Sequence, residues 1–180
     1  HAPITIDCTG RDAMWISKAG WRERDPEGFK SGMVCRAHDY FSDQPLHSVL
    51  IDVDSYDCIA TDPFTEPERA VWEFVTCMLP PEWQGAGYHW QLSSSHGHPS
   101  KRAQGLKVHI WFWLAKPLTS AQLKAYAERF MPAADLSLFQ PVQPHFTAVP
   151  VFEQGQVDPV PVRSGFVHGV MGDEVELTVD

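Results

Sequence analysis

The stretch from Ser48 to Asp54 constrains the fold most, because an apolar run delivers two carboxylates, Asp52 and Asp54, at its end. Alternate side chains of a β-strand point to the same face, so both carboxylates are expected on one face and Val53 on the other. Two like charges held this close are costly unless a positive group lies between them. Because both carboxylates can reach one hard cation, the pair is a candidate metal site. The alternative interpretation is a strand that ends in an Asp-rich turn and binds nothing.

Strands and helices are mixed along the rest of the chain without a regular βαβ rhythm, which indicates an α+β domain. The nearly continuous apolar run Leu106–Leu114 is rich in β-branched and aromatic residues and predicts a central strand. Further strands are expected at 32–36, 88–93, 143–152 and 174–179. We therefore expect a mixed central sheet with flanking helices.

Two helices are predicted from capping signals and from apolar side chains at helical spacing. A capping box formed by Thr119 and Gln122 opens a helix that continues to Met131. The other helix is expected to have Thr65 as its N-cap and Pro67 in its first turn. Its apolar stripe is expected to pack in the core and consists of Val71, Trp72, Val75, Met78 and Leu79.

The composition is that of a globular chain with an excess of acidic residues. Of the 180 residues, 43% are hydrophobic, and no apolar run is long enough to span a membrane. The net charge of −9 argues against a protein that coats nucleic acid through a general basic surface, although it permits a local basic groove. The four cysteines form no C-x-x-C pair, which favours reduced thiols in a cytoplasmic protein.

His109 lies near the start of the predicted central strand and is a candidate for binding phosphate. Lys107 lies two residues before it, and Ser93 and Ser94 are expected to face it across a hairpin. Hydroxyl, imidazole and ammonium groups that converge at a hairpin can hold phosphate oxygens. A lone histidine on a strand is also compatible with a core residue whose hydrogen bonds are satisfied.

Asp135 follows the second predicted helix and by itself is equally compatible with a turn or an N-cap. Together with Asp52 and Asp54 it gives three carboxylates that can hold two Mg²⁺ or Mn²⁺ ions, which prefer oxygen ligands. Such a two-metal site activates a 3′-hydroxyl and neutralises the charge that develops on a triphosphate. These features together outline a site for nucleotidyl transfer.

Three motifs in this order resemble those of the archaeo-eukaryotic primase superfamily: Ile51–Asp54, then Gly105 leading to His109 on an apolar strand, then Ala134-Asp135. The likeness is greatest to the primase-polymerase domains of replication proteins from plasmids, phages and other mobile elements. It implies a primase-like core with an N-terminal αβ unit and an RRM-like unit. Residues 1–180 would form a single catalytic domain, and since the chain opens on His1, we expect a fragment of a longer replication protein.

The resemblance also implies an activity, namely primer synthesis on a single-stranded DNA template from nucleoside triphosphates, with Mg²⁺ or Mn²⁺ as cofactor. Asp52, Asp54 and Asp135 would be the catalytic metal ligands. The residues implied to bind the nucleotide are His109, Ser93, Ser94, Lys107 and Arg163. A helicase domain or partner is expected in the full-length protein. No contact with a membrane is expected.

Two histidines compete for the second motif. The loop from Ser95 to Gly105 is longer than the serine-to-histidine signature usual in the family, so both His96 and His109 are candidates. His109 is favoured because the family histidine begins an apolar strand, which His96 does not.

Two other functions are compatible with the sequence. A rolling-circle or relaxase-type nuclease uses a tyrosine nucleophile on a helix, for which Tyr126 is the candidate. Such enzymes carry two histidines on a central strand, and this strand carries only His109. The other is a non-catalytic module that binds nucleic acid or protein, in which Asp52 and Asp54 belong to a turn.

Overall fold

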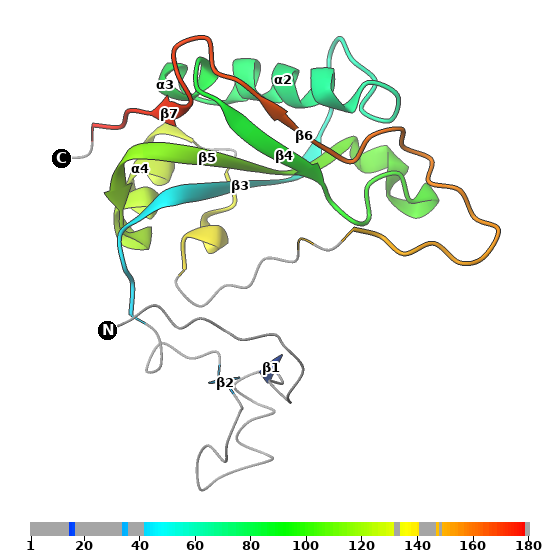
Figure 1. The fold of residues 1–180 in the computed structure, drawn as a ribbon, viewed down its shortest axis with the longest axis horizontal. Helices are drawn as coiled ribbons and strands as arrows, with labels where there is room; N and C mark the ends of the chain where they lie inside the picture. Colours follow the sequence, from blue (N-terminus) through cyan, green and yellow to red (C-terminus); the bar gives the residue numbers. More distant parts are fainter. Residues whose placement is uncertain are drawn as a thin grey trace, which may run out of the picture. The chain divides into compact units, whose positions relative to one another are not determined.

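In the computed structural model, the sheet is built around the predicted central strand, β5 (Leu106–Leu118). β3 (Leu46–Tyr56) pairs with it on one side and β4 (Tyr88–Leu92) on the other, both antiparallel. β6 (Ser164–Val167) extends the sheet beyond β4, which gives the order β3-β5-β4-β6 (Figure 1). The short β7 (Glu174–Val175) pairs with β5 in parallel, next to the residues that β4 leaves unpaired. The predicted mixed α+β class is confirmed.

The structure describes residues 15–16, 34–35, 42–131, 134–140, 147 and 149–178. The chain divides into two units, residues 1–43 with 141–143 and residues 44–140 with 144–180. In the first unit, β1 (Trp15–Ile16) and β2 (Val34–Cys35) pair in parallel. The sheet and every candidate site residue belong to the second unit.

Strand register gives the sheet two different faces. One face is apolar and buried, and on β5 it consists of every second residue from Leu106 to Leu114. The helices cover this face; Trp83, for example, packs edge-on against Phe112 with ring centroids 5.0 Å apart. The other face, called the opposite face below, carries Asp52, Asp54, His89, Gln91, Lys107, His109, Trp111, Trp113 and Phe166.

Helix α4 (Ser120–Phe130) begins as the sequence predicts. The Thr119 side chain accepts a hydrogen bond from the Gln122 amide at 3.2 Å, and the Gln122 side chain accepts one from the Thr119 amide at 3.0 Å. The other helical segments in the described part of the chain are α2 (Pro67–Met78), α3 (Pro81–Gln84) and two 3₁₀ helices, η2 (Pro99–Gln104) and η3 (Leu136–Phe139). No helix among the residues that the structure describes is long and apolar enough to cross a membrane.

The start of α2 differs from the prediction. Its N-cap is Glu66, and no side chain caps it, so the prediction of Thr65 as N-cap is wrong. Asp62 organises the preceding turn instead, because its carboxylate accepts from the Phe64 amide and its carbonyl from the Thr65 and Glu66 amides. The chain is thus already turning before Pro67, which occupies the first helical turn as expected.

The apolar stripe of α2 is also shifted from its predicted position. Val71, Val75 and Leu79 are buried, but Trp72 is 57% exposed and Met78 is 41% exposed. The core positions are completed by Ala70, Glu73 and Phe74. A charged residue on the buried side of a helix hides the true stripe from a count of apolar residues.

Two strand predictions near the C-terminus need correction. Residues 149–152 form no strand, while 143–146 and 148 lie outside the described residues. Strand β6 takes the edge position beside β4, and its four residues, which include Gly165, are too short a segment to show alternation. Of the strand expected at 174–179, only Glu174–Val175 forms β7 among the residues described.

Candidate functional site

Asp52 and Asp54 lie inside β3, so the alternative that places them in a turn is wrong. Both side chains project from the opposite face, because Val53 between them is buried in the core. The Asp52 side chain is 21% exposed and the Asp54 side chain 77% exposed. One carboxylate is therefore half sheltered by the sheet, and its neighbour faces solvent.

Strand β5 supplies each carboxylate with a basic partner. Asp52 and His109 are direct partners in the ladder, and His109 Nε2 lies 3.3 Å from Asp52 Oδ1. Lys107 Nζ lies 3.1 Å from Asp54 Oδ1 and donates to the Asp54 carbonyl oxygen at 2.5 Å. These pairs offset the repulsion between the two carboxylates, which would otherwise be costly on neighbouring positions.

Asp135 reaches the same place from a distant part of the sequence. Asp52, Asp54 and Asp135 line one pocket of about 300 Å³, with Phe74 and Met78 of α2 contributing to its wall. The Asp135 carboxylate also caps η3, since it accepts from the Ser137 amide at 2.8 Å and from the Ser137 hydroxyl at 2.9 Å. The structure therefore confirms that Asp135 is an N-cap, and its role as a metal ligand stays a prediction.

The oxygen donors of this pocket suit Mg²⁺ or Mn²⁺ by their chemistry. Within the described part of the chain, however, no three His, Cys, Asp or Glu side chains already stand close enough to share one ion. Lys107, His109 and Ser137 hold the carboxylates of Asp54, Asp52 and Asp135 respectively. The residues fit a divalent cation only if these internal contacts are exchanged for the ion.

Glu73 is a buried carboxylate that the sequence analysis missed. It lies on α2 and is 5% exposed. It accepts hydrogen bonds from the Ala60 amide at 3.0 Å, the Thr61 hydroxyl at 2.9 Å and the Tyr56 hydroxyl at 3.2 Å, as well as from the Ile59 amide. Burial alone raises the pKa of Glu73, but these hydrogen bonds to the charged form prevail and lower it. Glu73 thus anchors the loop that leaves β3 at the pocket.

His96 is a structural residue, which leaves His109 as the histidine of the candidate site. His96 is 1% exposed, and its Nδ1 accepts from the Lys107 amide at 3.3 Å while its Nε2 lies 3.1 Å from the Pro63 carbonyl oxygen. Its ring stacks on Phe64 with centroids 4.8 Å apart. Burial lowers the pKa of His96, so the imidazole is neutral in the folded chain.

The serines lie in the turn beside the site, and Arg163, which directly precedes β6, contacts this turn. The residue of β4 opposite His109 is Gln91, so the expectation that the serines face His109 is wrong. Ser93 pairs instead with Lys107, through its amide and the Lys107 carbonyl oxygen at 2.9 Å, and Ser94 is exposed.

The Arg163 guanidinium is already engaged by other parts of the chain. It pairs with Asp158, with Nη2 2.8 Å from Oδ1, and donates to the carbonyl oxygens of Ser93 and His96 at 3.4 and 3.2 Å. Because its side chain is only 11% exposed, Arg163 holds the 93–97 turn in place rather than facing a ligand. Its pairing with Asp158 also lowers the pKa of that carboxyl group.

Tyr126, the nucleophile candidate of the nuclease interpretation, lies on the other side of the sheet from His109. It is 5% exposed, and its hydroxyl accepts from Trp83 Nε1 at 3.2 Å. Burial raises the pKa of the Tyr126 hydroxyl, which disfavours a phenolate nucleophile. In this position, Tyr126 has no access to a nucleic-acid strand bound at His109.

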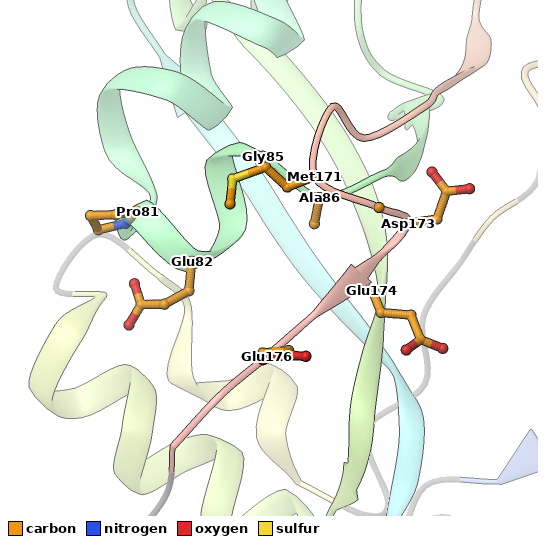
Figure 2. Close-up of a pocket in the computed structure, with 9 residues that line it drawn as sticks. Pro81, Glu82, Gly85, Ala86, Met171, Asp173, Glu174 and Glu176 are labelled. Atoms are coloured by element: carbon orange, nitrogen blue, oxygen red, sulfur yellow. The ribbon is translucent and has the colours of Figure 1, made fainter.

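A larger cavity of about 520 Å³ lies between α3 and the segment around β7 (Figure 2). It contains none of the predicted site residues, although four acidic side chains line it: Glu82, Asp173, Glu174 and Glu176. Figure 2 shows these side chains pointing in different directions rather than toward one point. Asp173 has a local task, because it accepts from the Gly169 amide at 3.0 Å. The smaller pocket is therefore the candidate site.

The pocket and its surroundings combine three carboxylates, two basic side chains and a neighbouring turn rich in hydroxyl groups, all within the second unit. Such a combination can bind a divalent cation and phosphate oxygens side by side. Comparison of the chain with protein-family models, with curated proteins and with solved structures gives no match.

Proposed function

We propose that this chain is the catalytic domain of a DNA-directed nucleotidyltransferase of the primase-polymerase kind, with a core like that of the archaeo-eukaryotic primases. The observation that carries the proposal is that Asp52, Asp54 and Asp135 line the same pocket. Three carboxylates around one pocket are the ligands that two-metal phosphoryl transfer requires. Asp135 is distant in sequence from Asp52 and Asp54, and the order of the motifs alone does not require the fold to bring it to the same pocket.

Each side chain has a distinct part in this proposal. Mg²⁺ or Mn²⁺ bound by Asp52, Asp54 and Asp135 would activate the 3′-hydroxyl of the growing primer and neutralise the triphosphate. Lys107 and His109 lie directly beside two of these carboxylates and would donate to phosphate oxygens. The hydroxyl groups of the neighbouring serine turn, Ser93 and Ser94, would complete the phosphate site, with Arg163 positioning that turn.

The opposite face offers a surface for the single-stranded DNA template. Trp113 and Phe166 are each 51% exposed there. Trp111 lies on the same face, and its ring centroid is 5.9 Å from that of His109 and 5.3 Å from that of His89. Aromatic side chains on a sheet stack with successive bases of a single strand and do not depend on a strongly basic surface.

Primer synthesis tests the proposal directly. The chain is incubated with single-stranded DNA, labelled ribo- or deoxynucleoside triphosphates and Mn²⁺, and short products are resolved on a gel. Substitution of both Asp52 and Asp54 by Ala should reduce synthesis by at least about 10³-fold, because the metal ligands are lost. Glu128→Gln, an exposed carboxylate on α4 outside the pocket, is the control and should retain activity. Polymerisation that survives the loss of both aspartates would exclude the proposal.

The second candidate function is a non-catalytic module that binds single-stranded nucleic acid. The exposed rings of the opposite face favour it, as does the pairing of Asp52 and Asp54 with basic residues. Under this function the unaltered chain binds single-stranded DNA but synthesises nothing, and the double Ala variant binds equally well. A nuclease is not proposed, because Tyr126 is buried on the helix-covered side of the sheet.

A further inference from the structure

Lys107 and His109 hold the same two carboxylates that the proposed function assigns to metal. Lys107 Nζ contacts both the carboxylate and the carbonyl oxygen of Asp54, and His109 Nε2 contacts Asp52 Oδ1 at 3.3 Å. The two pairs are neighbours, because Asp52 and His109 are opposite each other and Lys107 and Asp54 lie one pleat further along. The carboxylates proposed to bind metal and the basic side chains proposed to bind phosphate are therefore paired with one another.

Burial makes the Lys107–Asp54 pair unequal. The Lys107 side chain is 10% exposed, whereas the Asp54 side chain is 77% exposed. A buried ammonium group is costly without an anionic partner, while an exposed carboxylate is well solvated without one. If Asp54 turns to another ligand, Lys107 needs a replacement anion.

His109 is incompletely satisfied in its present position. Its Nδ1 is buried and has no hydrogen-bond partner among the described residues, although its Nε2 faces Asp52. Buried polar atoms are normally paired, and an exception calls for a ligand or a rearrangement. A rotation of the imidazole toward a ligand gives up one contact and can satisfy both nitrogens.

We infer that Lys107 and His109 occupy the carboxylates only until a divalent cation binds, and that both side chains then bind the phosphate oxygens of a nucleoside triphosphate. This inference rests on the proposed function and adds an order of events to it. Asp54 and Asp52 exchange their basic partners for the cation, and the released side chains take the triphosphate as their anion. Because binding free energies are linked, cation and triphosphate each tighten the binding of the other.

Mn²⁺ binding without nucleotide, measured by calorimetry or electron paramagnetic resonance, tests the exchange at the carboxylates. Lys107→Met keeps the aliphatic stem and removes the competing charge, so Mn²⁺ should bind about tenfold more tightly, as expected for one lost charge-assisted hydrogen bond. Lys116→Met is the control for the loss of a positive charge, because Lys116 is exposed toward the other end of β5. Its Mn²⁺ affinity should stay within about twofold of the unaltered chain. Equal or weaker Mn²⁺ binding by Lys107→Met overturns the inference.

Inorganic tripolyphosphate in the presence of Mn²⁺ tests the second half of the exchange. The unaltered chain should bind it more tightly with Mn²⁺ than without, and Lys107→Met should lose about tenfold in this affinity. The signature is the opposite sign of the two effects, tighter Mn²⁺ and weaker tripolyphosphate. A lysine that merely stabilises the fold would not produce it, and a parallel change in both affinities overturns the inference.

A measurement on the unaltered chain covers the case in which Lys107→Met does not fold. Without metal, the Lys107 amine is buried and paired, so it should react slowly with an acylating reagent. Mn²⁺ alone should raise its rate of modification several-fold, followed by mass spectrometry of the peptide that contains it, and tripolyphosphate should lower the rate again. A modification rate of Lys107 that does not change on addition of Mn²⁺ contradicts the exchange.

Failure of this inference and failure of the proposed function give different results. If Asp52→Ala abolishes Mn²⁺ binding while Lys107→Met leaves it unchanged, the metal site stands and the exchange is wrong. If Lys107→Met shows both expected changes but the unaltered chain makes no primer, the exchange stands and the polymerase function is wrong.

Discussion

His96 and His109 both lie in the hairpin of the candidate site, and their surroundings give them different chemistry. The Lys107 amide can only donate, so His96 Nδ1 must accept and Nε2 must carry the proton that it donates to Pro63. A second proton on His96 would set an N–H group against the Lys107 N–H group. Burial, the largest cause, lowers the pKa of His96 accordingly.

The lowered pKa predicts a loss of stability in mild acid. The unfolded His96 titrates near its ordinary value of about 6.5 and the folded one below it. The contribution to stability is therefore complete above about pH 6.5 and is lost as the pH falls from there through the folded pKa. Urea denaturation on both sides of this range should show the loss, and His96→Gln should show a smaller pH dependence. An equal pH dependence in His96→Gln and in the unaltered chain would contradict this assignment to His96.

Among the elements, α2 does more than cover the sheet. Glu73 extends from its buried side and fixes the loop that follows β3, through the amides of Ile59 and Ala60 and the hydroxyl of Thr61. Tyr56, which lines the candidate pocket, also donates to Glu73. The helix therefore determines where the strand that carries Asp52 and Asp54 ends.

Glu73→Gln should destabilise the fold and loosen this loop selectively. The amide group replaces one acceptor oxygen by a donor, which leaves backbone N–H groups without a partner, at a cost of about 2 kcal/mol in the free energy of unfolding. Urea denaturation measures this loss, and hydrogen exchange should speed up at the Ile59 and Ala60 amides before the rest of the sheet. Glu68→Gln, an exposed carboxylate in the first turn of α2, is the control and should change neither. Uniformly faster exchange throughout the sheet would contradict a local anchoring role.

The sequence predicts those elements whose local signals agree with their packing. The apolar run of β5 and the capping box of α4 are examples, and both are found where expected. The start of α2 could not be predicted, because the Asp62 turn competes with a cap at Thr65. The partners of Asp52 and Asp54 follow from strand register, which no local pattern specifies before the pairing of β3 with β5 is known.

At the scale of the whole molecule, the net charge of −9 restricts how a nucleic acid could be bound. Two basic residues near the candidate pocket, Lys107 and Arg163, are already paired with carboxylates. Few phosphate contacts imply a weak dependence of affinity on salt. Under the proposed function, the affinity for single-stranded DNA would then come largely from the exposed rings of the opposite face.

Matched substitutions of Trp113 and Trp72 test whether the rings of the opposite face bind single-stranded DNA. Trp113 is 51% exposed on the opposite face, and Trp72 is 57% exposed on α2. Trp113→Ala should weaken the binding of a labelled single-stranded oligonucleotide about tenfold in fluorescence anisotropy, because one stacking contact with a base is lost.

Trp72→Ala removes a ring of the same size and similar exposure from a helix that covers the other side of the sheet, so it should leave the affinity unchanged. Phe166→Ala should weaken binding in the same direction as Trp113→Ala, since Phe166 lies on the opposite face. Repeating the titration at several salt concentrations separates stacking from charge, because the salt slope should be shallow and equal in the two tryptophan variants. Equal weakening by Trp72→Ala and Trp113→Ala would show that the oligonucleotide binds elsewhere on the molecule. A steep salt slope together with an unchanged affinity of Trp113→Ala would show the same.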